Sequence, residues 1–317
     1  MIVEGIGCEP YRATGGAGAV GELNDILKHL QATLGPLDGT PQPLDGGITN
    51  HNFRVTLGGE DYVIRQPGKD TALLGIDRDA ERIANEAAAR LGIAPAVAAT
   101  LKDCLVTRFI SCQALGAREL AENVEEIARA LRRFHDSPTH LPTRFSVPEL
   151  LAHYGAIVRG RGGTLPDTYA QACAAADRIA AALGPHDPHP CHNDLLAGNI
   201  IRASEDDALL IVDWEYAGMG DRRFDLGNLS VNNNFDVETD ERMLTAYYEE
   251  DPSPRRRAAL ELMRLLSDAR EAAWGVVQAH VSELVFDFDG YAGEHFARLQ
   301  AAIDGRGFGR WLAEVAA

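Results

Sequence analysis

Short runs of alternating apolar and polar residues in the first third of the chain predict β-strands. Two such runs, Asn52–Leu57 and Tyr62–Gln66, flank Gly58-Gly59-Glu60-Asp61, whose composition is typical of a hairpin turn. A further strand is predicted over Cys104–Phe109. The segment from Gly35 to Gly47 is rich in Gly and Pro, which predicts a loop.

Apolar positions with a 3.6-residue period predict helices on both sides of these strands. One helix is expected over residues 18–34. In the next, apolar positions recur from Ile76 to Leu91, Asp77 can cap the N-terminus, and Gly92 ends the helix. Beyond residue 110 helical patterns dominate, and they cover Leu120–His135, Tyr169–Leu183, Glu241–Glu250, Pro254–His280 and Tyr291–Ile303.

Two segments of this helical remainder have a strand pattern. They are Asn199–Arg202 and Ala208–Asp213, and a turn at Ser204–Asp207 would pair them as a small hairpin. We therefore predict an α+β fold with a strand-rich N-terminal domain over residues 1–110 and a helical C-terminal domain over residues 111–317.

The composition narrows the classes of partner. The formal net charge of -17 disfavours binding to nucleic acid or to an anionic membrane, because both would be repelled. An acidic surface suits a cationic small substrate, although acidic composition is also common among soluble proteins. The five scattered cysteines form no metal-binding pattern, and no apolar run is long enough for a signal peptide or a membrane span. We therefore expect a cytoplasmic protein.

The strongest chemical signal is His192-Asn193-Asp194-Leu195-Leu196-Ala197-Gly198-Asn199, followed by the hairpin that ends at Asp213. Phosphoryl transfer needs a carboxylate beside the attacking hydroxyl and oxygen ligands that hold Mg²⁺ on the phosphates. Asp194, Asn199 and Asp213 have the spacing of these groups in a kinase catalytic loop. Asp and Asn also cap turns, but here several roles are filled together.

The same residues, with Asp213-Trp214-Glu215-Tyr216 and Phe224-Asp225-Leu226-Gly227-Asn228, resemble the choline/ethanolamine kinase branch of the aminoglycoside-phosphotransferase family. The resemblance implies a protein-kinase-like fold with two lobes, and ATP and Mg²⁺ as cofactors.

Within this resemblance, Asp194 is the catalytic base, and the metal ligands are Asn199, Asp213 and, for a second ion, Glu215. Asp225 is expected to order the catalytic loop by accepting backbone hydrogen bonds. We expect His192 to brace the loop rather than to transfer protons.

The segment Gly46-Gly47-Ile48-Thr49-Asn50-His51-Asn52-Phe53 resembles the nucleotide-covering loop of the family. Glycine lets the backbone approach phosphates closely. Thr49, Asn50 and Asn52 are candidate contacts to the nucleotide. A Gly-Gly pair before a strand is otherwise an ordinary turn.

Arg65 follows a strand pattern at the position where kinases place a cation on the nucleotide phosphates. Its expected partner is Glu81, because Glu86 lies nearly on the other side of the helix. The alternative is a solvated arginine at the end of a strand. Phe109 and Ile110 would form the hinge that contacts the adenine.

The segments Leu266–Gln278 and Phe286–Ala292 resemble the region that lines the choline pocket in choline kinases. Trp274 and Glu271 are candidate ligands of a cationic alcohol, and Tyr216 adds a third. Core packing of Trp274 and a surface ion pair of Glu271 are the alternatives. A second tryptophan expected nearby is replaced by Val277, which leaves ethanolamine or another amino alcohol open as the acceptor.

These expectations predict an ATP-dependent kinase that phosphorylates the hydroxyl of a small amino alcohol. An aminoglycoside or other small-alcohol phosphotransferase of the same fold is an alternative. A pseudokinase that binds nucleotide without catalysis is the alternative of another class, and the presence of Asp194, Asn199 and Asp213 argues against it.

Overall fold

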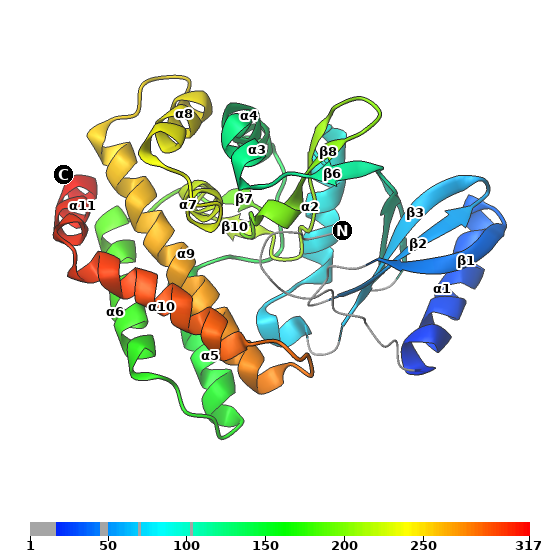
Figure 1. The fold of residues 1–317 in the computed structure, drawn as a ribbon, viewed down its shortest axis with the longest axis horizontal. Helices are drawn as coiled ribbons and strands as arrows, with labels where there is room; N and C mark the ends of the chain where they lie inside the picture. The colour runs from blue at the N-terminus through cyan, green and yellow to red at the C-terminus, as the bar shows by residue number, and fades with distance from the viewer. Residues whose placement is uncertain (1–16, 45–49, 69–70, 102–103) are drawn as a thin grey trace.

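A small antiparallel sheet forms one end of the molecule, and helices form the rest (Figure 1). The computed structural model describes residues 17–44, 50–68, 71–101 and 104–317. The sheet has the strand order β1-β2-β3-β5-β4. Its strands are β1 (Leu37–Leu44), β2 (Asn50–Leu57), β3 (Glu60–Pro67), β4 (Val97–Leu101) and β5 (Cys104–Arg108). Helix α1 (Ala17–Leu34) packs on this sheet through Leu23, Leu27 and Leu30.

The predicted hairpin is present, since β2 pairs with β3 across Gly58 and Gly59. Both glycines have positive φ, and a Cβ on Gly58 would lie 2.4 Å from the Leu34 carbonyl oxygen. The loop predicted from Gly35 to Gly47 is wrong over its middle part, because β1 lies there. This strand is at the sheet edge, where prolines such as Pro41 and Pro43 are tolerated.

Helix α2 (Arg78–Arg90) follows, after the short 3-10 helix η1 (Thr71–Leu74). The Asp77 side chain accepts a hydrogen bond from Ala80 N at 2.8 Å, so the predicted N-cap is confirmed. Strand β4 was not predicted, because its Val-Ala-Ala-Thr-Leu sequence has a weak strand propensity.

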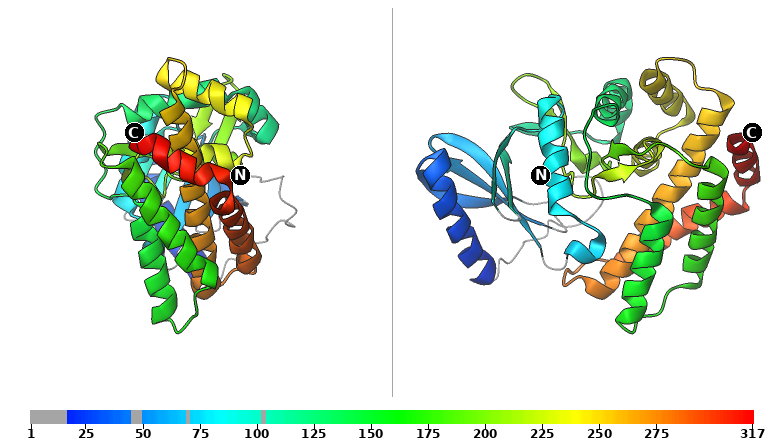
Figure 2. Two further views of the ribbon diagram at one scale, coloured as in Figure 1. Left: turned by 90° about the vertical axis from the view of Figure 1, so that its left-hand side faces the viewer. Right: turned by 180° about the vertical axis from the view of Figure 1, so that it is seen from behind.

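The C-terminal part contains nine described α-helices, and the longest of them, α9, is largely buried (Figure 2). They are α3 (Ala117–Glu122), α4 (Val124–His135), α5 (Val147–Gly160), α6 (Asp167–Leu183), α7 (Arg223–Asn232), α8 (Val237–Tyr248), α9 (Pro254–Val281), α10 (Phe288–Asp304) and α11 (Arg306–Ala316). The helix predicted over Leu120–His135 is split at Asn123 into α3 and α4.

Three of these helices were not predicted. Helix α7 is buried on every side from Phe224 to Val231, so its sequence has no amphipathic period. Helices α5 and α11 contain glycines, each of which lowers helix propensity by about 1 kcal/mol relative to alanine.

Residues 112–220 also form two small antiparallel sheets. One joins β6 (Cys112–Ala114), β8 (Ile200–Ala203) and β9 (Leu209–Ile211), and the other pairs β7 (His189–Cys191) with β10 (Gly218–Gly220). The predicted β8–β9 hairpin is therefore present. The α+β fold is confirmed, whereas the boundary at residue 110 stays a prediction.

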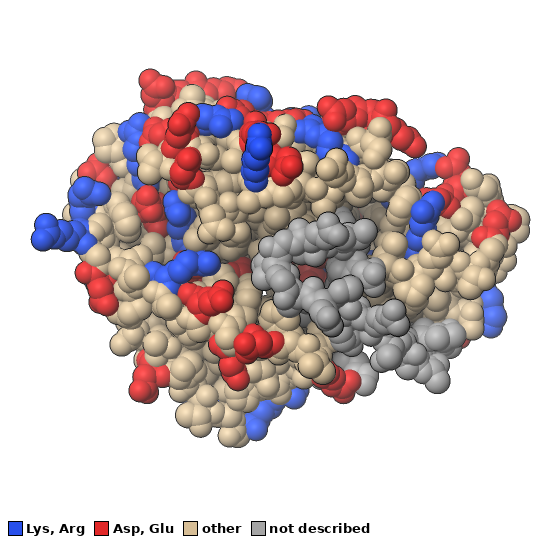
Figure 3. All heavy atoms as spheres, viewed as in Figure 1, with Lys and Arg blue, Asp and Glu red and all other residues tan. Residues whose placement is uncertain are grey.

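The surface mixes charges of both signs on the face seen in Figure 3. Among the described residues, no helix is long and apolar enough to cross a membrane.

Candidate active site

The loop between β7 and β8 carries Asp194, and Asp225 at the start of α7 holds its backbone. The Asp225 carboxylate accepts hydrogen bonds from His192 N at 2.8 Å and from Asn193 N at 2.7 Å. It also contacts His135 Nε2 at 2.8 Å. Burial disfavours its charge, but these partners hold the pKa of Asp225 below its usual value. A completely buried carboxylate thus fixes two successive loop amides, at a point where Asn193 has positive φ.

His192 connects the loop to the end of β9. Its Nδ1 accepts a hydrogen bond from Asp194 N at 3.2 Å, so Nε2 carries the proton and donates to Val212 O at 3.0 Å. Burial lowers the pKa of His192, which keeps the ring neutral. This geometry supports a bracing role.

Asn228 on α7 is a further support that the sequence motif contained without an assigned role. Its Oδ1 accepts a hydrogen bond from Leu195 N at 2.5 Å, and its Nδ2 donates to Ser267 Oγ of α9 at 3.0 Å. The loop is therefore tied to both buried helices of the C-terminal part.

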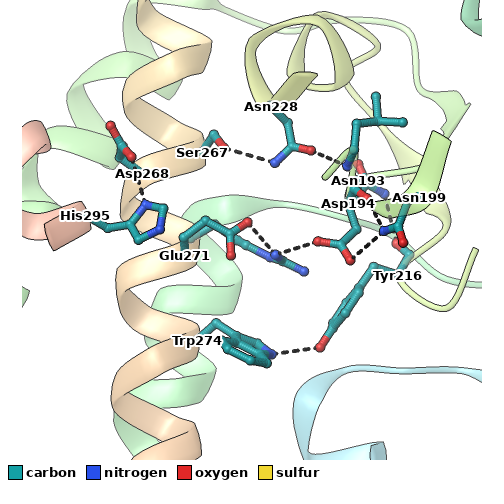
Figure 4. A network of polar contacts seen from close by, with 12 residues as sticks. Asn193, Asp194, Asn199, Tyr216, Asn228, Ser267, Asp268, Glu271, Trp274 and His295 are labelled. Atoms are coloured by element: carbon teal, nitrogen blue, oxygen red, sulfur yellow. Dashed lines mark hydrogen bonds and ion pairs between the residues drawn. The ribbon is translucent and has the colours of Figure 1, made fainter. Parts of the chain in front are cut away.

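The Asp194 side chain lies beside Asn199 (Figure 4), and it also contacts Arg270 of α9. Its Oδ1 is 3.0 Å from Arg270 Nη1, and its Oδ2 is 3.4 Å from Asn199 Nδ2. Burial raises the pKa of Asp194 to about 7, and the positive charge of Arg270 opposes this shift. The carboxyl group is therefore suited to proton exchange near neutral pH.

Asp213 and Glu215 follow β9, on the side of the site that faces the N-terminal sheet. Arg65 Nη2 pairs with the Asp213 carboxylate and lies 3.8 Å from Glu215 Oε2. Arg65 Nε lies 3.4 Å from Glu81 Oε1. Burial works against the charge, but the three carboxylates raise the pKa of Arg65 above its usual value. Arg65 is thus a half-buried cation within an acidic cluster, not a solvated one.

Of the two nearby charged residues on α2, only Arg78 joins this cluster. Glu86 does not reach it, because its carboxylate pairs with Arg82 at 3.0 Å. Arg78, which the sequence reasoning missed, has Nη1 2.6 Å from Glu81 Oε2 and donates from Nη2 to Asn50 Oδ1 at 2.9 Å. The signal for Arg78 was its place three residues before Glu81 on the same helix.

The remaining described residues predicted to contact the nucleotide lie in β2 and just after β5. Asn50 donates to Glu215 Oε2 at 2.7 Å, and Asn52 lies opposite Arg65 in the sheet register. The ring of Phe109 is covered by the Arg54 guanidinium at 4.0 Å. Ile110 packs on the apolar cluster of Ile201, Ala203 and Leu210. Thr49 and the adjoining glycines lie outside the described residues.

The side chains on this side of the site offer the oxygen atoms that a magnesium ion needs as ligands. Asp213 and Glu215 are carboxylates and Asn199 offers an amide oxygen, the hard ligands that Mg²⁺ prefers. Val212 N donates to Asn199 O at 2.9 Å, which brings the residue before Asp213 against Asn199. Asp213 also has positive φ.

Helix α9 forms the opposite wall with Glu271 and Trp274 (Figure 4). Trp274 Nε1 donates to the Tyr216 hydroxyl at 2.9 Å, and Tyr291 donates its hydroxyl to Glu271 Oε2 at 2.7 Å. Glu271 is 2% exposed, so the alternative of a surface ion pair is wrong. Its partner is Arg270, whose Nη1 lies 2.6 Å from Glu271 Oε1.

Comparison with known proteins identifies the family. The sequence model described as the phosphotransferase enzyme family matches residues 40–261. The chain belongs to this family. It is similar to a choline/ethanolamine kinase family protein from Mesorhizobium loti, with 30% identity, a TM-score of 0.76, and coverage of 94% of this chain and 99% of that one. The expected family and its kinase-like fold are confirmed.

Curated relatives point to the same family. Protein LicA of Haemophilus influenzae is 26% identical over 214 residues, which span 64% of this chain and 61% of LicA. Ethanolamine kinase 1 of the mouse is 26% identical over 84% of this chain and 85% of its own length. Probable choline kinase 1 of Arabidopsis thaliana is 25% identical over 80% and 84%.

Proposed function

We propose that this chain transfers the γ-phosphoryl group of ATP to the hydroxyl of a small amino alcohol of the choline and ethanolamine type. The observation that carries the proposal is the buried carboxyl of Asp194, held on a braced loop between the Asn199, Asp213 and Glu215 donors and the α9 wall. The named choline and ethanolamine kinases among its relatives support it. Because ATP is the donor, we place the reaction in the cytoplasm.

Asp194 would accept the proton of the acceptor hydroxyl while that oxygen attacks the γ-phosphorus and ADP departs. Its backbone is immobilised through the bonds of His192 and Asp225, so little reorganisation is needed on binding. Mg²⁺ held by Asn199 and Asp213, with Glu215 for a second ion, would neutralise negative charge on the phosphates.

Arg65, which pairs with the proposed metal ligand Asp213, would supply a positive charge to the phosphates. Its ion pairs with Glu81 and Glu215 help to keep the guanidinium at this position. Glu81 is in turn held by Arg78 at 2.6 Å. Asn50 contributes a polar side chain at the start of β2. We propose Thr49, Asn52, Phe109 and Ile110 as further nucleotide contacts.

On the acceptor side, we propose that Glu271, Trp274 and Tyr216 form the wall beside the hydroxyl to be phosphorylated. Trp274 is 8% and Tyr216 7% exposed, so neither is a surface residue, and both belong to the apolar cluster around α9. Their rings are fixed by the hydrogen bond between them.

The test is release of ADP from Mg·ATP with choline, ethanolamine, related amino alcohols and a set of aminoglycosides. We expect saturable turnover on an amino alcohol, with Asp194→Asn as the inactive control. Turnover on aminoglycosides alone would favour the alternative acceptor class. Release of ADP no faster than the Asp194→Asn background on every acceptor would refute the proposal and favour a pseudokinase.

A further inference from the structure

Arg270 occupies the acceptor side of the site, one helical turn before Trp274 on α9. Its side chain is buried, with 2% exposure, and its Nη1 bridges Asp194 Oδ1 and Glu271 Oε1 at 3.0 and 2.6 Å. Nε and Nη2 of the same guanidinium are also buried, and neither has a hydrogen-bond partner in the described part of the chain.

Nε and Nη2 form one edge of the planar guanidinium, with two parallel N–H groups. This edge matches the two oxygens of a carboxylate or phosphate. A buried donor without a partner costs about 1–3 kcal/mol, and native proteins contain few of them. The Nε–Nη2 edge of Arg270 lies next to the proposed catalytic carboxyl of Asp194 and has the geometry to bind an oxyanion.

Arg270 also contacts the aromatic ring and the carboxylate that would otherwise bind a quaternary ammonium group. Its guanidinium lies over the Tyr216 ring, 4.4 Å from the centroid. The Glu271 carboxylate is bound on one oxygen by Arg270 and on the other by Tyr291. A trimethylammonium group would meet a fixed positive charge here, and like charges repel.

We propose that Arg270 determines the acceptor specificity, and that its Nε–Nη2 edge binds an oxyanion of the acceptor. This rests on the proposed function and narrows it: the amino alcohol carries a carboxylate beside its ammonium group. The hydroxyl would face Asp194, and the carboxylate would lie on the Nε–Nη2 edge of Arg270. A phosphate monoester shares this chemistry and is a separate arm of the test.

The experiment compares acceptors that differ in one group. In the first pair, L-serine is ethanolamine with an added carboxylate. In the second pair, glycerol 3-phosphate is glycerol with an added phosphate. Choline, the N-trimethyl form of ethanolamine, is tested as well. We would measure kcat/KM by ADP release for each acceptor. We expect kcat/KM of an oxyanion-bearing acceptor to exceed that of the other member of its pair by at least about tenfold. Among the amino alcohols, choline should have the lowest kcat/KM. Preference in the serine pair assigns a carboxylate, and preference in the glycerol pair alone would refute the carboxylate in favour of phosphate.

Variants then test whether Arg270 is responsible. Arg270→Gln removes the charge, and Arg270→Lys keeps the charge but loses the fork. Both also disturb Asp194, so the readout is the ratio of kcat/KM within a pair. We expect the ratio to fall about tenfold in both. Arg264→Gln removes another α9 arginine, which pairs with Asp240 at 2.9 Å, and should leave the ratio unchanged.

The wild-type ratio decides the question even if the variants fail to fold. Equal or lower kcat/KM for the oxyanion-bearing member of both pairs, or a ratio that survives Arg270→Gln, would overturn the proposal. Calorimetric binding of the same pairs, with a non-hydrolysable ATP analogue present, separates the two proposals. Tighter binding of the oxyanion-bearing member without turnover would support the role of Arg270 and count against the kinase reaction. Weaker, equal or absent binding would overturn the role of Arg270.

Discussion

Replacing Asp225 by Asn tests how the catalytic loop is held. The buried carboxylate accepts hydrogen bonds from His192 N and Asn193 N and contacts His135 Nε2, at 2.7 to 2.8 Å. An amide keeps the shape but puts an NH₂ donor where one oxygen now accepts, so at least one loop N–H loses its partner. A hydrogen bond to a charged group is worth about 1.5–3 kcal/mol, and the stranded donor adds a penalty of about 1–3 kcal/mol.

We therefore expect Asp225→Asn to lower the free energy of unfolding by about 3 kcal/mol, measured by urea titration. Turnover should also fall, because the displaced loop carries Asp194, the proposed base. The matched control is Asp194→Asn, which removes a carboxylate that accepts no hydrogen bond from a backbone N–H of the described residues.

In that control, Arg270 keeps its bond to Glu271, and the buried negative charge is removed. The free energy of unfolding should therefore stay within about 1 kcal/mol of the wild type, and affinity for ATP·Mg should persist. Turnover should fall about 10²–10⁴-fold, the usual contribution of a general base. An Asp225→Asn protein with unaltered turnover and stability within about 0.5 kcal/mol of the wild type would refute this account of the loop.

Three further predictions follow from single contacts. The ionised fraction of Asp194 rises with pH, so kcat/KM should rise up to pH about 7 and level off above it; a flat profile through this range would contradict the role of Asp194 as base. Arg65→Lys keeps the charge but not the fork, and should raise KM for ATP about tenfold without changing KM for the acceptor; an effect on the acceptor alone would exclude a nucleotide role. Gly227→Ala would place a Cβ 2.6 Å from the backbone carbonyl carbon of Met263, so we expect a loss of about 2 kcal/mol or more in urea unfolding, and an unaltered midpoint would show that α7 and α9 can separate.

Short-range patterns were predicted well because their causes are local. The Gly58-Gly59 turn requires residues that adopt positive φ, and the Asp77 cap bonds an amide three residues away. Asp194 and Asn199 likewise belong to one short loop, so their proximity follows from the local sequence. The edge strand β1 was missed because only its place at the sheet edge makes its prolines acceptable.

The sequence by itself thus determined the kind of chemistry, through the residue types and spacing of the catalytic loop. Only the tertiary structure decided which side chains surround it. Arg270 lies 76 positions from Asp194, and its helix is buried on nearly all sides, so no apolar period indicates which residue faces the carboxyl. Asn228 was placed in the same way, by packing of α7 on α9, and the contact of Arg78 with Asn50 likewise joins separate elements.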